Sequence, residues 1–163
     1  MISLTFVLNG KITTIETPPN RRVIDLLRED FGLTAAKEGC GTGECGACTI
    51  LVDGESRLSC LMLAAQLEGR SITTVEGLEE GTNRAERIQA AFIRHGAVQC
   101  GFCTPGMVLA ISDLLDRDPA PDREKIRQGI SGNLCRCTGY QKIVDAVEAV
   151  ISETHGRAKE RNT

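Results

Sequence analysis

The stretch GCGTGECGAC at residues 39–48 decides the fold, because it places four glycines and three cysteines within ten residues. Glycine at this density excludes a regular helix or strand and predicts a loop with unusual backbone angles. A fourth cysteine follows at Cys60, so the spacing is C-x4-C-x2-C and then one more cysteine. Plant-type ferredoxins use this spacing to hold a [2Fe-2S] cluster. We therefore expect one such cluster on Cys40, Cys45, Cys48 and Cys60.

The same loop has two other possible interpretations, a structural zinc site and a dinucleotide-binding motif. Four thiolates also suit a structural zinc ion, although such sites usually pair two C-x2-C knuckles. Residues 41–46 spell G-x-G-x-x-G, but a dinucleotide fingerprint needs a strand before it and a helix after it. Here we expect the reverse order, with a helix before the loop and a strand after it. The glycines instead allow backbone N–H groups to point inward at a sulfur-rich anion.

The residues around the loop predict a mostly β unit. Alternation of apolar and polar residues indicates strands, an Asn-Gly dipeptide favours a two-residue hairpin turn, and apolar residues at helical spacing indicate a helix. The expected elements are a hairpin over 2–17 with its turn at Asn9-Gly10, a helix over 23–31 that stops at Gly32, and a strand that ends at the Asp53-Gly54 turn.

The second half of the chain predicts four helices with short connections, which is typical of a bundle. Their signals are a capping box at Asn83 and Glu86, a cap at Thr104 followed by Pro105, a break at 118–122 before a short helix, and an apolar stripe from Ile143 to Ile151. The fold class is therefore α+β. We expect an N-terminal domain over 1–76, a linker over 77–82, a helical domain over 83–155 and a polar tail over 156–163.

A second set of cysteines lies at the ends of two predicted helices. Cys100 and Cys103 form C-x2-C before one helix, and Cys135 and Cys137 form C-x-C before another. This spacing alone suits a cluster or zinc, and two disulfides are a further possibility in an exported protein. The positive end of the helix that starts near Thr104 favours an anionic centre, which fits either metal but not a disulfide.

The composition and charge of the chain indicate which kinds of partner it can bind. Lys plus Arg number 19 against 22 Asp plus Glu, a formal net charge of −3, with no basic stripe that could follow a phosphate backbone, so we expect no nucleic acid partner. The N-terminus MISLTFVLNGK has neither a secretory signal nor a membrane-spanning segment, so we expect a cytoplasmic protein with no membrane contact. Eight Cys against one Tyr, four Phe and no Trp indicate that the sulfurs do more than pack.

Three strings carry a family resemblance: GCGTGECGACTILVDG, QCGFCTPG and GNLCRCTGYQKI. They closely resemble the iron–sulfur small subunit of the molybdenum hydroxylases, the family of xanthine oxidase, aldehyde oxidoreductase and CO dehydrogenase. The likeness spans roughly residues 2–153 and includes all eight cysteines. It implies a ferredoxin-like β-grasp domain followed by a four-helix bundle, with one [2Fe-2S] cluster in each.

The resemblance also implies a function and a set of site residues. The chain would relay electrons from a molybdopterin centre on a large partner subunit to FAD on a medium subunit or to another acceptor, and it would have no catalytic residue of its own. Cys100, Cys103, Cys135 and Cys137 would hold the cluster nearer molybdenum, and the first set the cluster nearer flavin. Gln99 and Cys137 match positions that contact the pterin. A free-standing two-cluster ferredoxin and a zinc-binding interaction module are the alternatives.

Three further residues are expected to have ordinary structural roles. His95 and His155 could be imagined as ligands of a Rieske-type site, but eight cysteines already complete two clusters, so we expect surface histidines. Tyr140, the only tyrosine, is expected to pack at the start of the last helix with its hydroxyl hydrogen-bonded.

Overall fold

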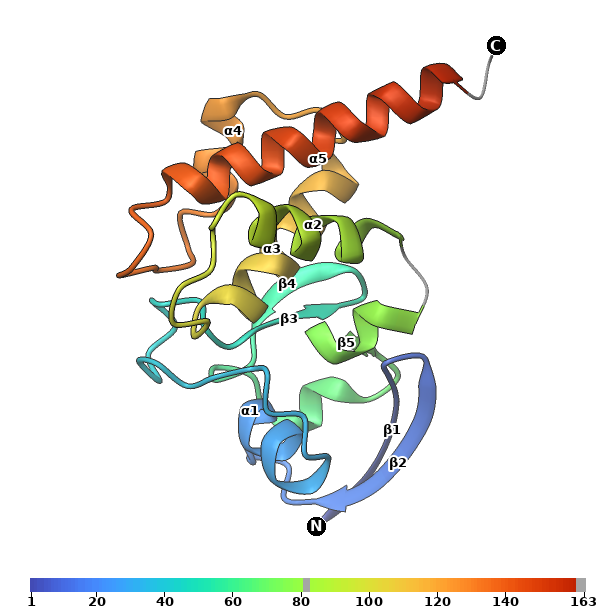
Figure 1. Cartoon of the computed structure of the whole chain (residues 1–163). Helices are drawn as coiled ribbons and strands as arrows, with labels where there is room; N and C mark the ends of the chain where they lie inside the picture. Colours follow the sequence, from blue (N-terminus) through green and yellow to red (C-terminus); the bar gives the residue numbers. More distant parts are fainter. Residues whose placement is uncertain (81–82, 161–163) are drawn as a thin grey trace.

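The computed structural model describes residues 1–80 and 83–160, and the side chains of all of these except 79, 80, 83 and 155–160. Figure 1 shows a β-rich half and a helical half, with α3 lying between the sheet and the other helices. The fold class is α+β, as the sequence predicts. The expected capping box at Asn83 and the placement of His155 lie outside the described side chains.

The first half is built on one five-stranded mixed sheet with the strand order β2-β1-β5-β3-β4. Only β1 and β5 pair in parallel, and the other neighbours are antiparallel. The strands are β1 (Ile2–Leu8), β2 (Lys11–Thr17), β3 (Thr49–Val52), β4 (Glu55–Leu58) and β5 (Ser71–Thr73).

Both turns predicted from sequence are confirmed. Strand β1 pairs with β2 from Ile2 opposite Thr17 to Leu8 opposite Lys11, so Asn9-Gly10 forms the hairpin turn. Both turn residues have positive φ, 49° and 79°, as a two-residue turn of this kind requires. The Asp53-Gly54 turn has the same character and connects β3 to β4.

The predicted helix over 23–31 is present, but most of it is a π-helix rather than an α-helix. It starts as α1 (Val23–Asp25) and continues as the π-helix η1 (Leu26–Asp30), and Gly32 follows with φ 65°. Two short 3₁₀ helices, η2 (Ala64–Leu67) and η3 (Val75–Glu80), are additions that the sequence pattern did not indicate. Part of the expected linker over 77–82 is therefore helical.

The helical half contains α2 (Asn83–Arg94), α3 (Thr104–Arg117), α4 (Arg123–Gly129) and α5 (Gln141–Glu160). The break at 118–122 is confirmed, and the Asp122 carboxylate caps α4 by accepting a 2.8 Å hydrogen bond from the Lys125 N–H. The cap predicted at Thr104 is wrong. The Thr104 N–H already bonds to the Gly101 carbonyl at 3.3 Å, so the chain has turned by then and Cys103 takes the N-cap position.

Helix α5 is longer than the apolar stripe predicts. It continues to Glu160, so residues 156–160, which were expected in a polar tail, are helical. Figure 1 shows α5 running along the outer side of the bundle and projecting beyond it. None of the helices in the described part of the chain is long and apolar enough to cross a bilayer.

Helix α3 joins the two halves. Its residues from Gly106 to Leu115 are all buried, including the polar Ser112 and Asp113. Leu51 of β3 belongs to the same hydrophobic cluster as the buried residues of α3, so α3 covers one face of the sheet. Across this contact the Ser56 N–H of β4 donates to the Asp113 carboxylate at 3.1 Å. The two cysteine sets are therefore carried by halves that pack directly against each other.

Candidate metal centres

The first cysteine set lies on the glycine-rich loop between η1 and β3 and on the segment after β4. Cys48 and Cys60 are buried, and Cys40 and Cys45 are half-buried. The Sγ atoms of Cys48 and Cys60 lie 3.3 Å apart beside the buried side chain of Ile24. The four cysteines of the first set therefore lie at the boundary between solvent and the hydrophobic core.

Three backbone N–H groups of this loop point at the Cys40 sulfur. Those of Thr42, Glu44 and Cys45 approach its Sγ at 3.4, 3.3 and 3.4 Å. The wrapping depends on left-handed backbone at Gly41 and Gly43, whose φ angles are 66° and 83°. The Thr42 side chain and then these N–H groups lower the pKa of the Cys40 thiol to about 6. The inward N–H cradle expected for this loop is therefore present.

Burial has the opposite effect on Cys48. Desolvation raises the pKa of its thiol, because the charged form is poorly stabilised away from water. A metal centre would have to displace the proton from this sulfur, and the charge of the metal would then take the place of the missing solvent.

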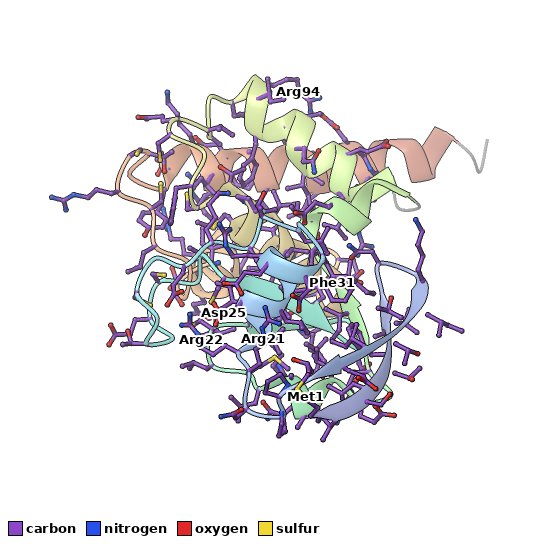
Figure 2. All side chains as sticks on the ribbon, turned by 90° about the horizontal axis from the view of Figure 1, so that it is seen from below. Met1, Arg21, Arg22, Asp25, Phe31 and Arg94 are labelled. Carbon is purple, nitrogen blue, oxygen red and sulfur yellow. The ribbon has the colours of Figure 1, made fainter. Side chains whose placement is uncertain are left out.

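An ion-pair network supports the loop from α1. The Arg22 guanidinium bonds to Asp25 at 2.7 Å and to Glu38 at 2.7 Å, two residues before Cys40. Figure 2 shows Arg22, which precedes α1, next to Asp25 of that helix. The hydrogen bond from Arg22 lowers the pKa of the Glu38 carboxyl. The network ties the start of the cysteine loop to α1.

The second cysteine set lies where α3 and α5 begin. Cys100 and Cys137 are exposed, with Sγ atoms 3.5 Å apart, and Cys103 and Cys135 are half-buried. Burial raises the pKa of the Cys103 thiol to about 12. Burial also opposes ionisation of Cys135, but hydrogen bonds from Thr138 outweigh it and lower the pKa of that thiol.

Two residues hold Cys135 in place. The Thr138 hydroxyl lies 3.0 Å from its Sγ. The Cys135 N–H donates a 2.7 Å hydrogen bond to the hydroxyl oxygen of Tyr140, whose backbone has φ 67°. The prediction that Tyr140 packs at the start of the last helix with a bonded hydroxyl is confirmed. Sequence reasoning did not identify Thr42 or Thr138, whose only signal is a hydroxyl close to a cysteine.

The two cysteine loops touch each other. The Leu134 N–H donates a 2.8 Å hydrogen bond to the Cys45 carbonyl, and the Asn133 side-chain amide donates to the Gly46 carbonyl at 2.9 Å. Each bond joins a residue of the first set's loop to the segment just before Cys135. Two sets far apart in the sequence therefore form one continuous region.

The arrangement of the sulfurs suits a two-iron centre. All eight cysteines are free thiols, so none is used in a disulfide. A close pair of sulfurs occurs in each set, and a [2Fe-2S] cluster takes two protein ligands on each iron.

Gln99 is exposed and precedes Cys100 in the chain, and Cys137, which forms the close sulfur pair with Cys100, is also exposed. His95 follows the last residue of α2 and is half-buried, so it is less exposed than the surface position predicted for it.

Two family models together match most of the chain. A 2Fe-2S iron-sulfur cluster binding domain matches residues 6–73, and a [2Fe-2S] binding domain matches residues 74–148. Each model takes in one of the two cysteine sets described above.

Known proteins are similar over most of the chain. The nicotinate dehydrogenase small FeS subunit of Eubacterium barkeri is 51% identical over 150 residues, which cover 92% of this chain and 95% of the relative. The structure of quinoline 2-oxidoreductase from Pseudomonas putida 86 has a TM-score of 0.87 at 47% identity and covers 96% of each chain. The aldehyde oxidoreductase of Desulfovibrio desulfuricans has a TM-score of 0.88 at 40% identity, and the match covers 96% of this chain but 17% of that one. The chain therefore belongs to the family of iron–sulfur electron-transfer subunits of the molybdenum hydroxylases.

Proposed function

We propose that this chain holds two [2Fe-2S] clusters and relays electrons from a molybdopterin centre on a larger partner subunit to FAD on a further subunit or to another acceptor. Cys40, Cys45, Cys48 and Cys60 would hold one cluster, and Cys100, Cys103, Cys135 and Cys137 the other. Each cluster, when bound, takes up and gives up one electron at a time. In this proposal the substrate is converted on the partner subunit rather than on this chain.

The observation that carries the proposal is the contact between the two cysteine loops. The 2.8 Å hydrogen bond from the Leu134 N–H to the Cys45 carbonyl connects a residue next to Cys135 with a cysteine of the first set. A relay needs its two centres close together and held at a constant separation. A protein that used two metal sites only for stability would not need their ligand loops to be joined.

The chain's own residues would give the two centres different surroundings. Three N–H groups at Cys40 and a hydroxyl at Cys135 stabilise negative charge on these sulfurs. Hydrogen bonds to sulfur and solvent exposure are among the factors that set the potential of an iron–sulfur centre. Two cysteines of the first set are buried, whereas two cysteines of the second set are exposed to solvent.

The exposure of the second set supports its place beside the molybdenum subunit. Cys100, Cys137 and Gln99 lie on the surface, where a partner's cofactor could approach them. We propose that Gln99 and Cys137 contact the pterin and that the first cluster lies nearer the flavin.

The test is to measure iron, acid-labile sulfide, zinc, molybdenum and flavin in the protein purified from its native source, and to run its subunits on a denaturing gel. About four irons per chain, two per cluster, with molybdenum and larger companion bands, are expected. The same iron content in a chain that purifies alone would favour a free-standing ferredoxin. Zinc in place of iron would overturn the proposal.

A further inference from the structure

The Gly46 carbonyl lies at the centre of the contact between the two cysteine loops. It accepts three hydrogen bonds: from the Thr49 hydroxyl at 2.7 Å, from the Asn133 side-chain amide at 2.9 Å and from the Thr49 N–H at 3.1 Å. Both donor residues are buried, with about one-twentieth of their surface exposed. Asn133 also donates to the Thr49 hydroxyl oxygen at 3.2 Å. The Asn133 amide is therefore the link from the helical half to this carbonyl.

The backbones at this point approach so closely that only glycine fits. A Cβ on Gly46 would overlap the Gly132 carbonyl oxygen and lie 2.7 Å from the Asn133 amide nitrogen. A Cβ on Gly106, in the first turn of α3, would overlap the Gly46 carbonyl oxygen. Gly46 follows Cys45 directly, Gly106 lies three residues after Cys103, and Asn133 lies two residues before Cys135. The contact therefore joins both cysteine loops within a few bonds of their sulfurs.

We propose that Asn133 is a positioning residue, whose side-chain amide fixes the first cysteine loop against the second and so sets the separation of the two clusters. The proposal rests on the proposed function, because it assumes that both clusters are present. The position needs a donor that faces both a carbonyl and a hydroxyl oxygen. An aspartate of the same shape would place a carboxylate oxygen against these acceptors and push the loops apart.

The experiment uses the full chain with both clusters reduced, and measures by low-temperature electron paramagnetic resonance the magnetic splitting that each reduced cluster induces in the other. This splitting decreases steeply with distance. Two variants disturb the contact from different sides: Asn133→Asp removes the donor, and Gly106→Ala wedges α3 away from the Gly46 carbonyl. Alanine is also a better helix former than glycine, so Gly106→Ala should not weaken α3 itself. Gly132→Ala is the matched control, since its Cβ meets nothing within 4 Å.

Both test variants should keep wild-type iron and sulfide but show a reduced or lost splitting, and Gly132→Ala should match the wild type. Asn133→Asp should also melt about 2–8 °C lower, because a buried polar contact is lost. Wild-type splitting in both test variants would overturn the proposal, as would loss of a cluster in Asn133→Asp with unchanged splitting in Gly106→Ala. Failure of the proposed function is a separate result: the wild-type chain itself would then lack two [2Fe-2S] signals.

Discussion

The backbone N–H of Leu134 donates a 2.8 Å hydrogen bond to the carbonyl oxygen of Cys45. This bond uses no side-chain atom, so it depends only on the path of the two loops. Glycine-rich and irregular segments have little structure of their own, so we expect each loop to hold this path more firmly when its cysteines share one centre. The two loops should therefore stabilise each other, and loss of a whole cluster from one set should also lower the stability of the other loop.

Replacing Cys135 with alanine tests this mutual support. We expect Cys135→Ala to lose about half of the iron, because one of two clusters loses a ligand. Its melting temperature should also fall, since metal binding contributes to folding in small metal-binding domains. Iron analysis and thermal unfolding measure the two effects. Ser131→Ala is the control, since this exposed hydroxyl of the same loop donates to the nearby Gln128 carbonyl and contacts no cysteine among the described residues. Full iron content with an unchanged melting curve in Cys135→Ala would contradict the prediction.

Local patterns account for the parts of the fold that sequence could predict. The hairpin is specified by alternation and by Asn9-Gly10, which lie next to each other in the chain. The parallel pairing of β1 with β5 brings Val7 opposite Ser71, and no short-range pattern encodes it. The start of α3 was misassigned by one residue because the turn before it belongs to the cysteine loop, whose shape depends on the rest of the site.

The candidate site also has one part that the sequence could predict and another part that only the folded structure shows. Metal-binding chemistry is a property of the cysteine residue, so both sets could be picked out from their spacing, and for the second set spacing alone left zinc and disulfides as alternatives. The role of Asn133 could not, because it arises from a contact with Gly46, 87 residues away in the sequence. An asparagine near a cysteine is ordinary in a loop, and only the folded chain brings it to a buried carbonyl.

Tyr140→Phe should weaken the second site. The substitution removes the hydroxyl oxygen that accepts the Cys135 N–H at 2.7 Å and leaves that donor without its partner. A loss of about 1–2 kcal/mol in the free energy of unfolding is expected, measured by denaturant titration. The paramagnetic signal of the second cluster should shift while that of the first, an internal control, stays unchanged. Equal stability and an unshifted second signal would refute this role of the hydroxyl.

Asp113→Asn should loosen the contact between the two halves. The Asp113 carboxylate is 7% exposed, accepts from the Ser56 N–H at 3.1 Å and pairs with Arg117 at 2.9 Å. The asparagine keeps the shape but removes the charge, so we expect a loss of about 1–2 kcal/mol in unfolding free energy, limited by the exposure of Arg117.

Asp116→Asn on the same helix is the matched control for Asp113→Asn. Asp116 pairs with Arg84, but it is largely exposed, and its loss should change the free energy of unfolding by less than about 0.5 kcal/mol. Denaturant unfolding of both variants measures the difference. Equal destabilisation of the two would mean that burial at the domain contact does not decide the effect.

Comparing Gly46→Ala with Gly54→Ala separates the cost of a left-handed backbone from the effect of a steric clash with the facing loop. Both glycines have positive φ, 70° and 85°, so alanine at either position costs about 1–2 kcal/mol in a left-handed conformation. A Cβ on Gly54 would meet nothing within 4 Å, so Gly54→Ala should lose only this amount and keep both clusters. In Gly46→Ala the added carbon also collides with backbone atoms of the facing loop, so the segment between Cys45 and Cys48 must move. We expect this variant to lose about two irons per chain, those of the first cluster, as measured by iron analysis. If the two variants keep the same iron content, then strain alone, rather than the close contact of the two loops, governs this position.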